Sequence, residues 1–422
     1  MKVTSVKTQK RSDSTKLSGK IITWGTDNAY PQRLQEIIQS SGTGRVCVDL
    51  RRKFIIGRGF ANEAVGQQVI NSKGLTWEKL LTENARDLAS LDAVALHFNF
   101  NAFFEITEIN FVPVDTLRFA LPVGNEIMSV FQHDDWGKRN VAIKPFNISD
   151  AVEYDLYQDD IEYFYQRIEE VEGIENYKGM ILFIGNMGDK IYSLPLVDAC
   201  ATDMNSEDGV ATIKNRNCKN NFLPAGAFVT KKAKNPGGTN DQTEYQRNGE
   251  VDENGQMFLN FQGDEKACKI LQVEIEYNED EPKFIKMEMN NYDTAFQYTE
   301  ESVQGNIRQI MMIPPILVGV DVGAGFGAEL MTNAYKYYNT VTQGDRDFLT
   351  RLYTEISDKF AEQVNDEFEI EALTYTEEST KIETPKDLIE IISNPNLPFN
   401  KKVLILTKAY GVSEADAIIL AT

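Results

Sequence analysis

The sequence has little of what marks a membrane protein, a secreted protein or a metal-binding protein. It contains no run of eighteen apolar residues, and its first residues lack the apolar core of a signal peptide. We therefore expect a cytoplasmic protein without membrane insertion. Four cysteines are scattered without Cys-x-x-Cys spacing, and the only histidines are His97 and His133, so a structural zinc site is disfavoured.

Signatures of an enzyme are missing as well. No Gly-x-x-x-x-Gly-Lys-[Ser/Thr] sequence is present, which argues against a P-loop ATPase, and neither histidine accompanies a serine or cysteine nucleophile motif. The acidic runs "EYNEDEP" and "NDEFEIEA" lack the spacing of an EF-hand and are typical of solvated surfaces. The sequence predicts neither catalytic residues, nor a cofactor, nor a metal site.

Positive charge is scarce after the first twenty residues. The chain carries a net charge of -21, yet residues 1–20 hold six Lys/Arg against Asp13, so the remainder carries -26. A protein that binds DNA by releasing counterions from phosphates needs a basic face, and none is evident. The acidity either serves solubility or forms a surface that repels phosphate, and composition does not decide between the two.

What is present indicates an α+β protein of two or three domains with real cores, because 42% of the residues are hydrophobic. We expect residues 1–20 to form a flexible basic arm. Helical patterns follow, then alternating strands over residues 102–121. Strand-like segments at 141–144 and 180–185 flank the acidic piece 159–172. A third helical pattern runs from Ala328 towards Phe360, and small helices after residue 371 form a C-terminal cap.

Two long helices bracket a small lobe in the middle of the chain. Ser193 is a candidate N-cap for a helix that continues to Lys219, and Phe296, Val303 and Ile307 keep one face of a helix over 293–313 apolar. Between them lie turn signals and short β-like runs at 257–261 and 270–275. We expect a β-rich lobe at the end of a helical stalk.

A glycine-rich stretch, "PPILVGVDVGAGFG", follows the second helix. Pro314 and Pro315 stop that helix. A phosphate-binding loop would require a preceding strand, whereas here a helix precedes it, which disfavours nucleotide binding. The apolar side chains Val318, Val320, Val322 and Phe326 are either buried at a subunit contact in an ordinary connection, or exposed on a flexible loop.

The order of several segments resembles the portal proteins of tailed double-stranded DNA bacteriophages. The segments are "WGTDNAYPQRLQEIIQSSGTGRVCVDLRRKFIIGRGF", "ITEINFVPVDTLRF", "ILFIGNMGDKIYSLPLVDA", "NNFLPAG" and "YDTAFQYTEESVQGNIRQIMMIPPILVG". The resemblance spans most of residues 20–370 and depends on their order and spacing. The sequence departs from it in the acidic connections at 145–180 and in the central lobe.

The resemblance implies a ring, normally of twelve subunits, at one capsid vertex of the virion. Such a ring is a head-tail connector that passes double-stranded DNA during packaging and ejection, and it contacts the terminase large subunit, the major capsid protein and neck or adaptor proteins. The implied parts are the arm 1–20, the wing 21–191 and 329–370, the stem helices 192–220 and 291–313, the clip 221–290, the tunnel loop 314–328 and the crown 371–422.

The resemblance also implies site residues, although no catalytic ones. DNA-facing residues of the tunnel loop would be Val318, Val320, Asp321, Val322 and Phe326, with hinge glycines Gly319, Gly323, Gly325 and Gly327. Charged stem residues would be Lys214, Arg216, Glu300, Glu301 and Arg308. Acidic residues facing the channel would repel the duplex. The alternatives are a subunit of a nucleic-acid-processing enzyme and another component of the head-tail connector.

Overall fold

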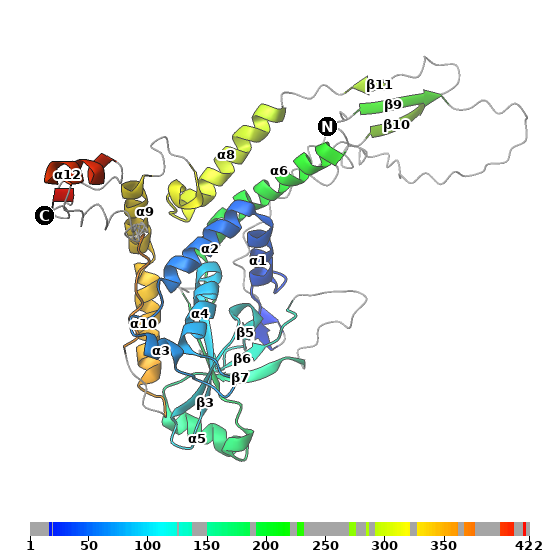
Figure 1. Cartoon of the computed structure of the whole chain (residues 1–422). Coiled ribbons are helices and arrows are strands. Elements are labelled where there is room, and N and C mark those ends of the chain that lie inside the picture. The colour runs from blue at the N-terminus through cyan, green and yellow to red at the C-terminus, as the bar shows by residue number, and fades with distance from the viewer. Residues whose placement is uncertain are drawn as a thin grey trace, which may run out of the picture. The chain divides into compact units, whose positions relative to one another are not determined.

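The computed structural model describes residues 17–18, 20–124, 126–136, 150–185, 191–219, 226–231, 270–275, 284–286, 292–320, 327–361, 367–375, 397–408 and 417–418 (Figure 1). Most of the basic arm and the strands expected at 141–144 and 257–261 lie outside these residues. By compactness the chain divides into two units, one of residues 1–325 with 333–373 and one of residues 326–332 with 374–422.

A six-stranded mixed sheet organises the larger unit. Its strands are β3 Ala93–Phe100, β4 Ile106–Phe111, β5 Leu117–Phe119, β6 Ser129–Gln132, β7 Val152–Leu156 and β8 Met180–Gly185, and their order in space is β4-β3-β8-β7-β6-β5. Neighbouring strands are antiparallel except β7 and β8, which are parallel. The α+β fold class is therefore confirmed.

Both faces of the sheet are buried at β3, which explains why the sequence of this strand is a nearly continuous apolar run. Ala93 and Ala95 belong to one core cluster, whereas Val94, Leu96 and Phe98 on the opposite face belong to a second one. Side chains alternate along a strand, so these two sets mark the two faces.

The described helices belong to both units, and several helices of the larger unit contribute to its two cores. They are α1 Tyr30–Ser40, α2 Gly42–Ile56, α3 Glu63–Gln67, α4 Trp77–Leu91, α5 Ile161–Glu170, α6 Ala201–Lys219, α8 Tyr292–Ile310, α9 Ala328–Val341, α10 Gln343–Ser357 and α12 Phe399–Lys408. Short 3₁₀ turns are η1 Val114–Thr116, η3 Ile174–Asn176, η4 Leu196–Cys200 and η6 Pro315–Val318. Residues of α1, α2, α6 and α8 share one cluster, and residues of α4 and α10 share the other.

Two smaller sheets complete the described strands. One pairs β1 Leu17–Ser18 with β2 Ile21–Ile22. The other has the order β10-β9-β11, with β9 Gly226–Lys231, β10 Ile270–Ile275 and β11 Phe284–Lys286. This second sheet falls within the segment expected to be β-rich. Across the described residues, no helix is long and apolar enough to cross a membrane.

Two helix predictions require correction. Ser193 does not cap a helix, because its hydroxyl donates to Leu91 O at 2.7 Å, and the chain instead forms η4 before α6 starts at Ala201. The helix expected from Ala328 towards Phe360 is two helices. It breaks at Thr342, whose hydroxyl is hydrogen-bonded to Tyr338 O and to the Arg346 guanidinium. The Ser193 contact spans 102 residues, whereas the hydrogen bonds at Thr342 each join residues four positions apart.

A fully buried arginine attaches the segment before α1 to the sheet. Arg118 on β5 lies 5.6 Å from the ring centre of Trp24 and 5.2 Å from that of Trp136. Its guanidinium donates to Asn28 Oδ1, to Gln32 Oε1 and to main-chain carbonyls. Burial lowers the pKa of Arg118 to about 10. Because neutral acceptors satisfy all its donors, this charge is held in place without a carboxylate in hydrogen-bonding contact.

Candidate functional site

The two stem helices of the sequence analysis are α6 and α8, and they lie side by side (Figure 1). Lys214 near the end of α6 forms an ion pair with Glu300 of α8. At the other end of the pair, Met204 of α6 is buried in one cluster with Ile307 and Met311. The helices are therefore antiparallel, and the intervening chain leaves from and returns to the same end of the pair.

The predicted charged residues occupy different positions on this pair. Lys214 and Glu300 meet, Glu301 is exposed and accepts from Gln297 Nε2 at 3.0 Å, and the side chain of Arg216 lies outside the described residues. Arg308 is half-buried, and its charge acts on the Cys47 thiol, whose pKa burial nevertheless raises to about 12. Arg308 thus lies at the base of the pair, near α2.

The base of α6 is fixed by a carboxylate that sequence reasoning missed. Glu207 Oε2 accepts from the main-chain N–H of Thr43 at 3.1 Å, Glu207 Oε1 accepts from its hydroxyl at 2.6 Å, and the carboxylate also accepts from the Ser41 hydroxyl. Ser41 is the N-cap of α2 and accepts from the Gly44 N–H at 2.9 Å. A negative charge at a helix N-terminus is stabilising. Glu207 therefore joins α6 to the first turn of α2.

Close packing supports the same joint. A Cβ added at Gly44 would lie 2.8 Å from Met204 Sδ, a distance that no real side chain tolerates without movement. The sequence "SGTG" at 41–44 reads as a loop, but Ser41 is a helix cap and Gly44 is the point where α2 approaches α6. The run of small residues at 41–44, followed by apolar periodicity from Val46, was the sequence feature that could have indicated a helix start and a close helix contact here.

The turn after α8 begins with a left-handed residue. Met312 has φ of 55°, the N–H of Ile313 donates to Arg308 O at 2.9 Å, and the N–H of Met312 donates to Gln309 O at 3.1 Å. This is the hydrogen-bond pattern of a Schellman motif, with methionine where glycine is usual. The chain then forms η6, which ends at Gly319 with φ of 78°. The helix therefore ends at Ile310, four residues before Pro314, and not at residue 313 as expected.

Only part of the predicted tunnel loop lies within the described residues. Val318 packs against the core cluster of its own chain, which leaves little of it for contact with DNA, whereas Val320 is 36% exposed. Gly319 needs its positive φ, and Gly327 precedes α9 without one. The other residues named for this loop, Asp321, Val322, Gly323, Gly325 and Phe326, fall outside the described residues. The prediction of a tunnel loop at these residues is therefore untested by the structure.

The helix pair is close to neutral, in contrast to the chain as a whole. α6 carries three acidic and three basic residues, and α8 carries three acidic residues and one basic residue, so the pair has a net charge of -2. In α6 the acidic residues come first and the basic ones last, which suits the helix dipole. Within the described residues, no group of acidic, histidine or cysteine side chains is arranged to hold a metal ion.

Comparison with known proteins gave similarity to solved structures alone. No family model matches the chain, and no curated protein matches it. A chain of the virion of a native gene transfer agent particle covers 88% of this chain over 92% of its own length, at 14% identity and a TM-score of 0.44. A chain in the neck of the native particle, computed with C12 symmetry, covers 89% over 93% of its own length at 15% identity and a TM-score of 0.45. A chain in the neck of the empty particle, computed with C6 symmetry, matches 89% of this chain and 94% of its own length, at 14% identity and a TM-score of 0.43.

Proposed function

We propose that this protein is a non-enzymatic structural subunit of a tailed double-stranded DNA phage or a related particle. In this proposal it forms a portal ring, and the bundle of α6 and α8 from each copy lines the channel. DNA enters during packaging and leaves during ejection through this ring. The terminase large subunit, the major capsid protein and neck proteins are its proposed contacts.

One observation carries the proposal. The antiparallel pair of α6 and α8 encloses an inserted β-sheet segment and runs directly into η6, a proline-initiated turn ending in a left-handed glycine. These elements occur in the order that the sequence resemblance implies for stem, clip, stem and tunnel loop. In a closed ring the pair of each copy packs between the pairs of its two neighbours, and no copy is left with an unpaired side.

The charge of the pair suits a channel in which DNA slides. A wall that bound phosphates through many lysines and arginines would release counterions and hold the duplex tightly. With a net charge of -2, α6 and α8 have no excess of basic residues for such binding. In a closed ring the same modest negative charge repeats on every copy and repels the duplex from all sides.

The joint at Glu207 gives the proposal a mechanical element. Because the carboxylate is bonded to the first turn of α2, force on the helix pair is transmitted to α2 and, through it, to the core shared by α1, α2, α6 and α8. A channel that withstands packaged DNA needs helices that do not tilt freely. Glu207 is a positioning residue in this proposal.

Electron microscopy of the purified full-length protein tests the proposal, with mass photometry as the companion measurement. We expect rings with a central hole and a mass of about twelve times the 47.7 kDa chain. In a reconstruction, α6 and α8 should line the hole. A protein that stays a compact monomer across salt and protein concentrations, or a ring whose hole is lined by the β3–β8 sheet, would overturn it.

A second measurement separates a sliding channel from a DNA-binding protein. We expect the assembled rings to bind double-stranded DNA weakly and with little dependence on sequence, because their described inner helices lack a basic excess. Binding in the nanomolar range that weakens steeply with salt would favour the alternative, a subunit of a nucleic-acid-processing enzyme.

A further inference from the structure

The tip of the β3–β4 hairpin is tightly folded. Asn101 Oδ1 accepts from the N–H of Phe103 at 2.9 Å and from that of Glu105 at 3.1 Å, and Asn101 N donates to Glu105 O at 3.0 Å. Phe104 adopts a φ of 64°, which is uncommon for an aromatic residue. This network fixes residues 101–105 and leaves Phe103 with 76% of its surface exposed.

Rings beneath the tip brace it. Phe104 lies 5.2 Å from Phe100 and 4.8 Å from the fully buried Phe164 of α5, measured between ring centres. Tyr165 donates its hydroxyl to Ala102 O at 3.1 Å. Tyr165 and Ile161 of the same helix are each 48% exposed. We call Phe103, Ile161 and Tyr165 the apolar tip. Because it is held before any contact forms, little ordering entropy opposes its binding.

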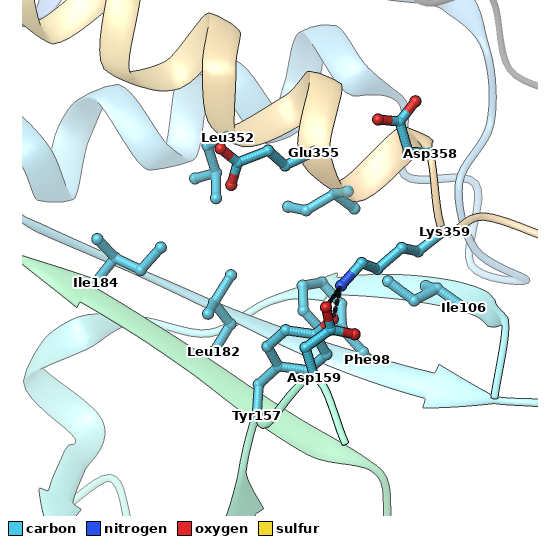
Figure 2. A pocket seen from close by; sticks show the side chains of 11 residues that line it. Phe98, Ile106, Tyr157, Asp159, Leu182, Ile184, Leu352, Glu355, Asp358 and Lys359 are labelled. Atoms are coloured by element: carbon cyan, nitrogen blue, oxygen red, sulfur yellow. Dashed lines mark hydrogen bonds and ion pairs between the residues drawn. The ribbon is translucent and has the colours of Figure 1, made fainter. Parts of the chain in front are cut away.

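A cavity of about 330 Å³ lies beside the strands of the same hairpin, between the sheet and α10 (Figure 2). Its walls are apolar, from Phe98, Ile106, Leu182, Ile184, Leu352 and Ile356. At its rim Lys359 Nζ lies 2.7 Å from Asp159 Oδ2 and donates to the Tyr157 hydroxyl at 2.8 Å, as Figure 2 shows. Glu355 and Asp358 also reach the rim, and within the described residues neither forms an ion pair. The cavity is therefore apolar inside and negative outside.

The cavity and the apolar tip belong to one surface. Tyr157 packs against Phe98 at 5.4 Å and against Phe100 at 6.4 Å between ring centres, and Phe100 in turn contacts Phe104. Ile106, which lines the cavity, directly follows Glu105 of the tip. One partner can span both features.

The charge around this surface selects the partner. Residues 150–180, which include α5 and Asp159, carry ten acidic and two basic side chains, a net charge of -8. At the rim, Asp159, Glu355 and Asp358 outnumber Lys359. A second copy would bring the same negative charge, and nucleic acid would be repelled. The long apolar stem and charged head of lysine or arginine fit an apolar cavity with an acidic rim.

We propose that the apolar tip and the acidic-rimmed cavity together form a docking surface for a different protein. That protein offers an apolar pocket to Phe103 and inserts a lysine or arginine side chain into the cavity beside Glu355 and Asp358. This proposal stands apart from the ring: it holds or fails whether or not the helix pair lines a channel.

Site-specific photocrosslinking in the cells that make the protein tests it. Phe103 is replaced by p-benzoylphenylalanine in the full-length chain, and the matched control carries the same group at Tyr298, a tyrosine 75% exposed on α8. We expect position 103 to give an adduct with one other protein, at a peptide containing lysine or arginine. No adduct at 103, or an adduct with a second copy or with nucleic acid, overturns the proposal.

Binding to that purified protein supplies the second arm. Phe103→Ala and the pair Glu355→Gln with Asp358→Asn should each weaken binding at least about tenfold, as is typical for central contacts of an interface, while Tyr298→Ala should match the unaltered chain. Higher salt should weaken binding to the unaltered chain more than binding to the Glu355→Gln, Asp358→Asn protein. A partner that binds Phe103→Ala or the neutralised pair as tightly as the unaltered chain refutes the docking surface.

Discussion

The helix-pair region, formed by α6, α8 and the turn after them, differs from the hairpin region, formed by residues 101–105 and α5, in both charge and attachment. The helix pair carries a net charge of -2, whereas the 31 residues from 150 to 180 alone carry -8. The acidity of the chain is thus concentrated away from the helices proposed to face DNA. The net charge of the whole chain therefore does not show which surface repels phosphate. The positions of the charged residues in the structure are needed for that.

The two regions are also held by different forces. Aromatic stacking around Phe164 holds the hairpin, and its exposed apolar side chains stay rigid because buried rings lie directly beneath them. At the base of α6, hydrogen bonds to the Glu207 carboxylate add to the packing of Met204. Packing loss in the hairpin should therefore cost more than the loss of any one polar contact in the helix pair.

The sharpest test of this contrast is Phe164→Ala. The side chain is fully buried and touches Phe100, Phe104, Tyr165 and Tyr177, so its removal should lower the free energy of unfolding by about 3–5 kcal/mol. Chemical denaturation at fixed protein concentration measures it, because assembly shifts apparent stability.

Phe103→Ala is the matched control, since Phe103 is 76% exposed. It should change the free energy of unfolding by less than about 0.5 kcal/mol. Equal costs for Phe103→Ala and Phe164→Ala would mean that the hairpin is not braced by buried rings.

Glu207→Ala tests the polar joint of the helix pair. It leaves the Thr43 N–H and hydroxyl without their acceptor, and we expect a loss of about 1–3 kcal/mol. Glu207→Gln keeps one acceptor oxygen and should cost less. Thermal unfolding of the two variants beside Glu301→Ala, an exposed carboxylate on α8, gives the comparison. If Glu207→Ala and Glu301→Ala lowered the thermal stability equally, the hydrogen bonds of Glu207 would not stabilise the base of α6.

Local patterns predicted the elements but not their joints. The apolar periodicity through Val303 and Ile307 identified α8, and the strand expected at 180–185 is β8. Periodicity shows which residues share a face of a helix or strand, and it predicts the element correctly where that face packs against a core. The bond from Glu207 to Thr43 spans 164 residues, and nothing in either segment indicates the other.

Sequence reasoning also failed where a polar residue had two possible partners. Ser193 has the character of an N-cap, but the fold places Leu91 O within its reach.

The helix α5 was missed for a different reason. It lies in the acidic piece 159–172, and Asp160 caps it by accepting from the Glu162 N–H. Its single fully buried residue, Phe164, gave too weak an apolar stripe to stand out among the charges.

A smaller effect is expected at the end of α8. Met312 adopts a left-handed backbone conformation that costs an ordinary residue about 1 kcal/mol relative to glycine. Met312 is 43% exposed, so Met312→Gly loses little packing and should stabilise the chain by up to that amount. Met312→Ala is the control, because it removes the same side chain and keeps the strain. Calorimetry that ranks Met312→Ala above Met312→Gly would contradict the strain at this position.

The smallest effect should come from the ion pair between Lys214 and Glu300, whose side chains are 45% and 37% exposed. Water and salt screen such a pair, so Lys214→Ala should cost about 0.2–1 kcal/mol, and less at high salt. Exchanging the two residues, Lys214→Glu with Glu300→Lys, should recover most of that loss, whereas Lys214→Glu alone places two carboxylates together and should cost more than Lys214→Ala. A loss above about 2 kcal/mol for Lys214→Ala would show that the pair is desolvated rather than screened. Copies packed side by side would exclude water from this pair, so the same measurement on monomer and on assembled protein shows whether assembly buries the outer face of the helix pair.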